Sequence, residues 1–324
     1  MSGREMEDSG ASIQEEASAA LDGTSGTHSN LRCFLDSVTP IVKAHRVPKA
    51  PHLPPSNDYH GNIADNNGVK CFYLADLWNL FYQWSACGVG TSVCIAPGET
   101  MEQYFVPYLS AIELYTNEAN VPASQSSHGW QNDCNMVYDR RFNEYNQHGA
   151  VDWTHGYQTP SQVSKSGVES RGELVFKYFE PDSPYERVPF VDQVYKLYNK
   201  CPSLSSLSSV ELSPSSWMSV FWYPTSHVLP AKNQKDLNTC FLTYHSLSTS
   251  EDNVALDSVH ASDHVVLAPF GLATYKLDAK VWASPNSGDQ EHIASLLNAA
   301  RSWLKKHNIH HHDFSYFSYR CSST

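Results

Sequence analysis

Three stretches of the chain place their apolar residues at the spacing of an α-helix. Residues 73–88 are the clearest, with Gly88 as a suitable residue to end the helix. A second pattern runs from Asp289 to Lys306 and stops at Asn308, and a third begins after Pro189. The apolar positions of the three patterns are Leu74, Leu77, Trp78, Phe81 and Tyr82; Ile293, Leu296, Leu297, Ala300 and Leu304; and Phe190, Val191, Val194 and Tyr198. The sequence therefore predicts three main helices.

Other apolar stretches are typical of β-strands. The predicted strands are residues 108–115 just after Pro107, 172–180, 217–223, 240–247, 273–282 and 313–319. Residues 217–223 are apolar on both faces and favour a central strand. In residues 273–282 the pattern alternates, so Thr274, Lys276, Asp278 and Lys280 are expected to face water.

The order of these elements indicates the fold class. Strands outnumber helices and do not alternate with them regularly, which favours an α+β fold over a parallel α/β fold. We expect a largely antiparallel mixed sheet of about six strands with three main helices packed against it. Residues 30–320 are predicted to be one domain, preceded by a disordered acidic tail at 1–29 and interrupted by a long polar insertion at about 116–171.

Charge and composition narrow the function classes. The 324 residues carry a formal net charge of −12, and Lys305-Lys306 is the longest basic run, which disfavours direct nucleic-acid binding and docking on anionic lipid. No apolar run is long enough to span a bilayer, and the start of the chain lacks a secretory pattern. We therefore expect no membrane or nucleic-acid partner, a cytoplasmic or nuclear location, and eight free thiols.

Residues 240–248, with the sequence CFLTYHSLS, combine a thiol, a phenol, an imidazole and hydroxyls. On a strand Cys240 and Tyr244 face one way and His245 the other, so Cys240 and His245 cannot form a nucleophile–base pair. His245 is predicted to be a core histidine that donates to a neighbouring carbonyl. If the protein has a pocket, His245, Tyr244 and Trp222 are its weak catalytic candidates.

Four further motifs contain residues that could bind a ligand or be modified, but each is better explained as an ordinary loop, cap or turn. His310 and His312 could hold a metal ion with a third ligand, but their spacing matches no established zinc pattern. Residues 87–98 lack a third glycine and follow a helix, which predicts a helix cap and a turn rather than a nucleotide site. Residues 180–187 are expected to be an exposed, solvated charge cluster that includes Glu180, Asp182, Glu186 and Arg187, and Ser213-Pro214 is a weak phosphorylation candidate.

Several longer motifs follow one another along the chain. They are FLDSVTP, LADLWNLFYQWSACGVGTSV, QYFVPYLSAIELY, GELVFKYFE with PYERVPFVDQV, LSPSSWMSVFWYP, CFLTYHSLS, PFGLATYKLDAKVW and AARSWL, followed by the His-Asp-Phe before the last predicted strand. Together and in this order they resemble a plant family of unknown function, DUF789. Coverage runs from about Asn30 to Tyr319. Family members often continue WYP with an Arg-containing stretch, whereas this chain has His227 there, which puts an anion-binding role of that stretch in doubt.

The resemblance implies a plant-type source and a soluble domain, and it implies no activity. Because no nucleophile–base or metal spacing stands out, we expect a non-enzymatic protein-interaction module with no cofactor and with one or more protein partners. The alternative is an enzyme or small-molecule-binding protein with a pocket near His245.

Overall fold

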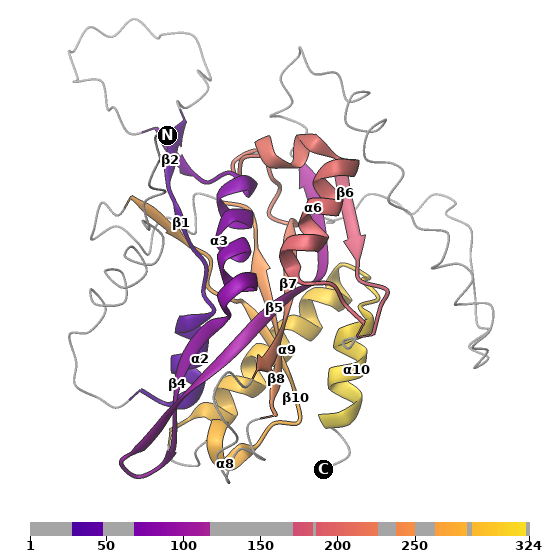
Figure 1. Ribbon diagram of the computed structural model, residues 1–324. Helices are drawn as coiled ribbons and strands as arrows, with labels where there is room; N and C mark the ends of the chain where they lie inside the picture. The colour runs from indigo at the N-terminus through magenta and orange to yellow at the C-terminus, as the bar shows by residue number, and fades with distance from the viewer. Residues whose placement is uncertain are drawn as a thin grey trace, which may run out of the picture.

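The computed structural model describes residues 28–47, 68–116, 171–183, 186–225, 238–249, 263–283 and 287–321. These segments form a six-stranded antiparallel sheet with strand order β10-β8-β7-β5-β4, in which β6 also pairs with β5 (Figure 1). The strands are β4 (Val89–Ala96), β5 (Glu99–Thr116), β6 (Glu173–Phe179), β7 (Trp217–Thr225), β8 (Cys240–Ser246) and β10 (Gly271–Tyr275). The predicted central position of residues 217–223 is confirmed, since β7 lies between β5 and β8.

Helices and short ribbons complete the described structure. Two antiparallel ribbons pair β1 (Ile41–Lys43) with β9 (His264–Val266) and β2 (His45–Val47) with β3 (Val69–Cys71). The helices are α2 (Asn30–Ser37), α3 (Leu74–Cys87), α6 (Phe190–Lys200), α8 (Ala279–Trp282), α9 (Asp289–Lys306), α10 (His312–Cys321) and the 3-10 turn η2 (Pro202–Ser206). The α+β class and the three main predicted helices, α3, α6 and α9, are confirmed. Along the described segments, no helix is long and apolar enough to cross a membrane.

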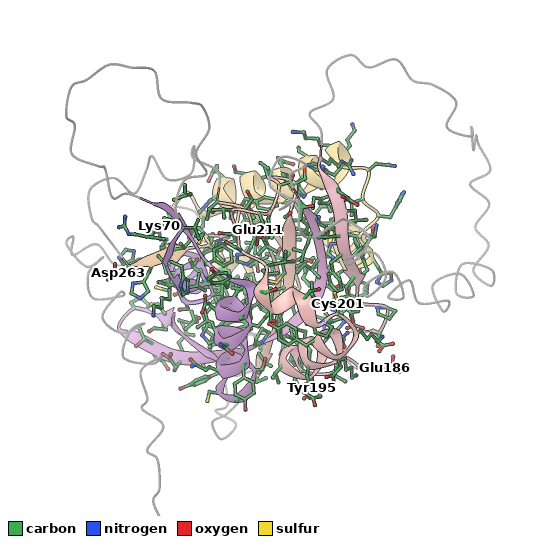
Figure 2. All side chains as sticks on the ribbon, turned by 90° about the horizontal axis from the view of Figure 1, so that it is seen from above. Lys70, Glu186, Tyr195, Cys201, Glu211 and Asp263 are labelled. Atoms are coloured by element: carbon green, nitrogen blue, oxygen red, sulfur yellow. The ribbon has the colours of Figure 1, made fainter. Side chains whose placement is uncertain are left out.

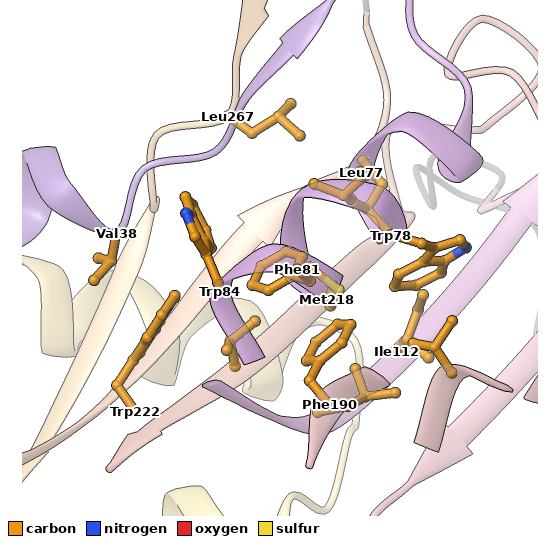
Figure 3. Packing of buried hydrophobic residues seen from close by; sticks show 14 of the residues in the cluster. Val38, Leu77, Trp78, Phe81, Trp84, Ile112, Phe190, Met218, Trp222 and Leu267 are labelled. Carbon is orange, nitrogen blue, oxygen red and sulfur yellow. The ribbon is translucent and has the colours of Figure 1, made fainter. Parts of the chain in front are cut away.

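Two apolar clusters lie on opposite faces of the sheet. The first contains buried residues of α2, α3 and α6, and the second contains residues of α9 and α10. Figure 3 shows the aromatic packing of the first cluster, in which Phe81 stacks on Phe190 with ring centroids 4.3 Å apart and Trp84 lies 5.7 Å from Trp222. Buried aromatic side chains of this size contribute strongly to core stability. The sheet is thus enclosed on both faces.

Residues 89–116 differ from the prediction because one strand is longer than the apolar pattern suggested. Gly88 does end α3, with φ of 74°, but the next residues form β4 rather than a turn, and β4 and β5 make a hairpin around Gly98. β5 begins at Glu99 and passes through Pro107. Pairing with β4 ends at Phe105 and pairing with β6 starts at Ala111, so on that side Pro107 lies between two partner strands, where its missing N–H is tolerated.

The predicted strand at residues 273–282 is shorter than expected. β10 ends at Tyr275, Lys276 adopts a positive φ of 53°, and Asp278 caps α8 by accepting from the backbone N–H of Lys280. Thr274, expected to face water, is buried, because α9 and α10 both pack on β10. The alternation of polar residues here reflects a turn and a helix cap rather than a solvated strand face.

Residues 313–319, predicted to be a closing strand, belong to helix α10. The aromatic residues of this segment are also compatible with helical spacing, and Phe314 and Phe317 at i and i+3 both pack in the second apolar cluster. The strand pattern and the helical spacing fit this segment about equally well. Burial of Phe317 against the sheet face therefore selects the helix.

The cysteines only partly follow the expectation of free thiols. Free thiols are found at Cys33, Cys71, Cys87, Cys94 and Cys240. Cys201 is disulfide-bonded, so the expectation of eight free thiols is wrong for this residue. The spacing of cysteines along a chain does not show which ones the fold brings together. The predicted acidic tail and nearly all of the predicted insertion lie outside the described residues.

Candidate functional site

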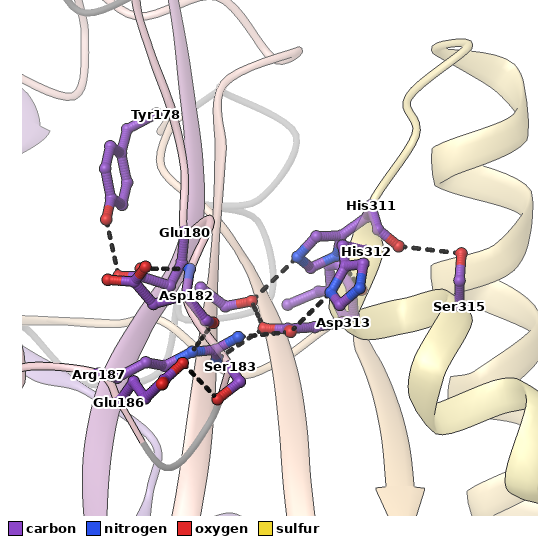
Figure 4. A network of polar contacts seen from close by, with 12 residues as sticks. Tyr178, Glu180, Asp182, Ser183, Glu186, Arg187, His311, His312, Asp313 and Ser315 are labelled. Carbon is purple, nitrogen blue, oxygen red and sulfur yellow. Dashed lines mark hydrogen bonds and ion pairs between the residues drawn. The ribbon is translucent and has the colours of Figure 1, made fainter. Parts of the chain in front are cut away.

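A chain of buried polar side chains connects the second face of the sheet to the start of α10 (Figure 4). Tyr244 Oη lies 2.7 Å from Nδ1 of His311, whose Nε2 lies 2.9 Å from Oγ of Ser110. Ser110 donates in turn to Oδ2 of Asp313. Arg187 closes the chain with two bonds to Asp313, at 2.8 Å and 2.6 Å. We call these five residues the buried relay.

The protons of the buried relay can be assigned from its connectivity. The one hydroxyl proton of Ser110 goes to the Asp313 carboxylate, so Ser110 Oγ accepts from His311 and Nε2 must carry the imidazole proton. Nδ1 of His311 is then an acceptor and receives the hydroxyl proton of Tyr244. Every bond points toward Asp313, from Tyr244 through His311 and Ser110 on one side and from Arg187 on the other.

A β-bulge places Ser110 in this relay. In the pairing of β5 with β7, Leu109 opposes Val220 and Ala111 opposes Ser219, so Ser110 is an additional residue. Leu109 belongs to the first apolar cluster and Ala111 to the second, so the bulge turns both Ser110 and Ala111 toward the face on which α10 packs. The backbone carbonyl of Ser110 accepts from the N–H of Glu180, which anchors the segment leading to Arg187.

The segment of Arg187 is not the solvated charge cluster that was predicted. Arg187 and Glu180 are buried, and Arg187 also donates from Nε to the carbonyl of Asp182 and lies 5.3 Å above the ring of Phe221. Glu180 accepts from the hydroxyl of Tyr178 at 2.7 Å. Asp182 and Glu186 are exposed as expected. The prolines of this segment predict a turn correctly, but they do not show that an ion-pair partner lies 126 residues away.

Burial and charge fix the protonation states of the relay. Burial lowers the pKa of His311 to about 4, although the negative charge of Asp313 opposes this shift, so the imidazole is neutral near pH 7. Burial raises the pKa of Tyr244 well above its usual value, and the charge of Asp313 adds to the effect. Burial alone would raise the pKa of Asp313, but the nearby imidazole of His312 and the hydrogen bonds and charge of Arg187 lower it.

The residue types of the relay are those of a hydrolytic triad, but their order is different. In a triad the histidine accepts the serine proton, whereas here His311 donates to Ser110 and the serine donates to the aspartate. Ser110 and Asp313 are also almost fully buried. The described geometry therefore does not activate Ser110 as a nucleophile. It attaches the first turn of α10 to β5, β8 and the segment before α6.

His245, the central sequence candidate, lies on the opposite face of β8 in a second, shorter chain. Its Nδ1 lies 2.8 Å from the carbonyl of Leu267 and its Nε2 lies 2.8 Å from Oγ1 of Thr243, which also accepts from Nε1 of Trp222. A carbonyl can only accept, so His245 carries its proton on Nδ1, and its predicted state as a donor to a carbonyl is confirmed. Burial lowers the pKa of His245 to about 4.

The structure separates the sequence candidates rather than bringing them together. Tyr244 and His245 point to opposite faces of β8, Tyr244 to the buried relay and His245 toward Trp222. His310 is exposed, and the side chain of His312 is 75% exposed and lies 3.8 Å from Asp313. Within the described ranges, no three His, Cys, Asp or Glu residues are grouped as metal ligands. Ser213 is buried and donates to the carbonyl of Arg171, and His227 lies outside the described residues.

We expect His245→Gln to change stability rather than to reveal a ligand-binding role. A glutamine cannot reproduce both ring contacts, so a buried group loses its partner, which costs about 1–3 kcal/mol in the free energy of unfolding. Urea denaturation measures this loss, with His264→Gln on the half-exposed strand β9 as a control of smaller effect. A His245→Gln protein of unchanged stability would contradict the core assignment.

Sequence reasoning missed Ser110, placed Arg187 in an exposed cluster and did not single out His311 as a site residue. A signal for His311 is present, because His310, His311, His312 and Asp313 are four consecutive polar residues that can act as ligands. Alternation cannot show which histidine of the run is buried. Ser110 carries no local signal, because a bulge depends on the pairing of two distant strands.

Comparisons with known proteins give a family but no activity. Neither a search of curated proteins nor a search of solved structures found a match to this chain. The model of the family described as "Protein of unknown function (DUF789)" matches residues 29–317, which include all five residues of the buried relay. Since this match spans most of the 324 residues, the chain belongs to the DUF789 family.

Proposed function

We propose that this protein is a non-enzymatic, intracellular module that binds other proteins. The observation that carries the proposal is that two buried histidines of the core hydrogen-bond to other buried groups of the same core. The imidazoles of His245 and His311 are neutral and use both ring nitrogens in hydrogen bonds within the core. Groups that hold the fold together in this way are not poised to exchange protons with a substrate.

The packed pair of helices α3 and α6 offers a surface for such a partner. Their contact is formed by Phe81 and Phe190, while Tyr82 on α3 and Tyr195 on α6 are 60% and 67% exposed. Figure 2 shows Tyr195 projecting outward from α6. Tyrosine is enriched among the residues that dominate binding energy at protein interfaces, because it adds large contact area and a polar tip.

Affinity capture from cells that express the protein tests this proposal. The wild type is compared with the double variant Tyr82→Ser/Tyr195→Ser and with Tyr316→Ser, a control at a partly exposed tyrosine on α10. We expect at least one partner that the wild type and the control retain and that the double variant loses. Versions without residues 1–29 or 116–171 report whether the acidic tail or the polar insertion contributes.

The alternative, an enzyme or small-molecule-binding protein with a pocket near His245, predicts the opposite pattern. A metabolite panel would raise the melting temperature of the wild type, as any ligand specific to the native state does. Such stabilisation, lost in His245→Gln and combined with capture that does not depend on the tyrosines, would reject the binding-module proposal.

A further inference from the structure

We infer that the outer edge of β6 binds an extended acidic segment of a partner protein, which joins the sheet as an additional strand. The inference rests on the proposed function and names the chemistry of one partner. Strand addition of this kind derives affinity from backbone hydrogen bonds and specificity from alternate side chains.

The other two edge strands contact neighbouring elements. At the β10 edge, α9 packs so closely that a Cβ on Gly271 would lie 2.9 Å from the Cβ of Ala300. At the β4 edge, the side chain of Asn30 accepts from the N–H of Cys94 at 2.7 Å and donates to its carbonyl at 2.8 Å, as a neighbouring strand would. By contrast, β6 pairs with β5 and with no other strand in the described part of the chain.

The two faces of β6 differ in character. Phe176 packs in the first apolar cluster, and Leu174, two residues earlier, is 45% exposed. Lys177 points to the other face, where its Nζ lies 2.8 Å from Oε1 of Glu113 and 4.9 Å from the ring centroid of Phe179. An added strand would therefore meet an apolar side chain on one face and a cation on the other.

Positive charge gathers around this end of β6, in a chain whose net charge is −12. Arg171 precedes the strand and interacts electrostatically with His307, the residue that caps α9. Lys305 and Lys306 form the exposed last turn of α9. In Figure 2, nitrogen-tipped side chains project into solvent where the pink strand meets the end of a yellow helix. The local charge is opposite to that of the protein as a whole and favours an acidic ligand.

A buried ring nitrogen also lies beside this cation group. Nε2 of His307 is buried and has no hydrogen-bond partner among the described residues, although the residue interacts electrostatically with Arg171 and Glu113. Glu113 is already satisfied by Lys177, Tyr115 and Trp217, at 2.8 Å, 2.9 Å and 3.2 Å. Four cations at this end, Arg171, Lys177, Lys305 and Lys306, thus outnumber the two nearby carboxylates, Glu113 and Glu173, so an incoming carboxylate would meet a net positive charge.

These features predict the pattern of the bound segment. Side chains of a strand alternate between faces, so acidic residues would face Lys177 and apolar residues would lie on the side of Leu174. The probe is a short fluorescein-labelled peptide that alternates Glu and Val. Two matched peptides serve as controls: one replaces Glu with Lys, and the other keeps Glu and Val but is N-methylated on alternate amides along the edge that would face β6.

Fluorescence anisotropy on the full chain gives the expected result. The Glu/Val peptide binds, the Lys peptide does not, and N-methylation lowers affinity at least tenfold. Lys305→Ser/Lys306→Ser weakens binding about fivefold, as expected for two exposed charges, whereas Lys280→Ser on α8 does not. In isotope-labelled protein, the peptide shifts the backbone amide signals of residues 174–178.

Three outcomes would overturn the inference. If the N-methylated peptide bound as tightly as the Glu/Val peptide, the binding would be non-specific charge attraction. If no peptide bound, an acidic partner strand at β6 would be excluded. Binding that appears only after residues 1–27 are deleted would mean that the acidic start of this chain, not a partner, occupies the edge. If the peptide fails while capture through Tyr82 and Tyr195 persists, the β6 assignment fails and the proposed function stands.

Discussion

Asp313→Asn is expected to lower the free energy of unfolding by about 3–5 kcal/mol, the usual effect of removing one partner from a buried ion pair. The side chain of Arg187 is fully buried and would keep its charge without the carboxylate that now accepts two of its hydrogen bonds. An asparagine also has one acceptor oxygen in place of two, so a hydrogen bond from Ser110 or Arg187 would be lost. The matched control is Asp36→Asn, because Asp36 forms an exposed pair with Arg32 at 2.9 Å and should cost less than about 1 kcal/mol.

Urea denaturation of the two variants measures this difference. A second comparison separates the ion pair from the loss of charge alone. Replacing both partners, as Arg187→Met/Asp313→Leu, should cost less than Asp313→Asn, because no uncompensated charge remains in the core. Equal stability of Asp313→Asn and Asp36→Asn would show that the relay does not hold α10 to the sheet.

Mild acid is expected to destabilise the protein well before its carboxylates are protonated. The pKa values of His245 and His311 are about 4 in the folded protein and near 6.5 in the unfolded chain. Between these values the unfolded chain binds more protons, so stability is complete above pH 6.5 and falls as the pH decreases toward 4. Each histidine contributes a loss of about 3 kcal/mol over this range.

Asp313 also makes the folded protein less stable as the pH falls, but at lower pH than the histidines. Its pKa is lowered in the folded protein, so its contribution is present above pH 3.8 and is lost as the pH falls below that value. The measurement is urea denaturation at steps from pH 7.5 to 4.5, with NMR titration of the imidazole signals to assign the effect. His245→Gln should reduce the slope by about half. A free energy of unfolding that stays constant between pH 7 and 5 would contradict the buried, neutral state of both rings.

The local elements of this fold could be predicted where burial follows a single period. The bounds of α9 were predicted from the spacing of Ile293 through Leu304, and Gly88 correctly marked the end of α3. Residues 313–319 were misassigned because their aromatic residues fit both a period of two and a spacing of i and i+3, and only contact with the sheet selects the helix.

The candidate site was harder to predict, because its parts lie far apart in the sequence. Arg187 and Asp313 each occur beside prolines or histidines that indicate exposed turns, and their pairing depends on the packing of α10 against β5. The strand around His245 was predicted correctly, including the opposite directions of its neighbouring side chains. Strand alternation is a local rule, whereas partners in a buried ion pair are chosen by topology.

The relay also has a consequence for the order in which the chain can fold during synthesis. Arg187 leaves the ribosome long before Asp313, and the strands β5, β7 and β8 can pair before α10 exists. Until α10 arrives, the guanidinium has no carboxylate to accompany it into the interior and must stay solvated. Final closure of the second face therefore waits until α10 has been synthesised, and a nascent chain stalled before residue 313 would present an incomplete sheet face to chaperones and proteases.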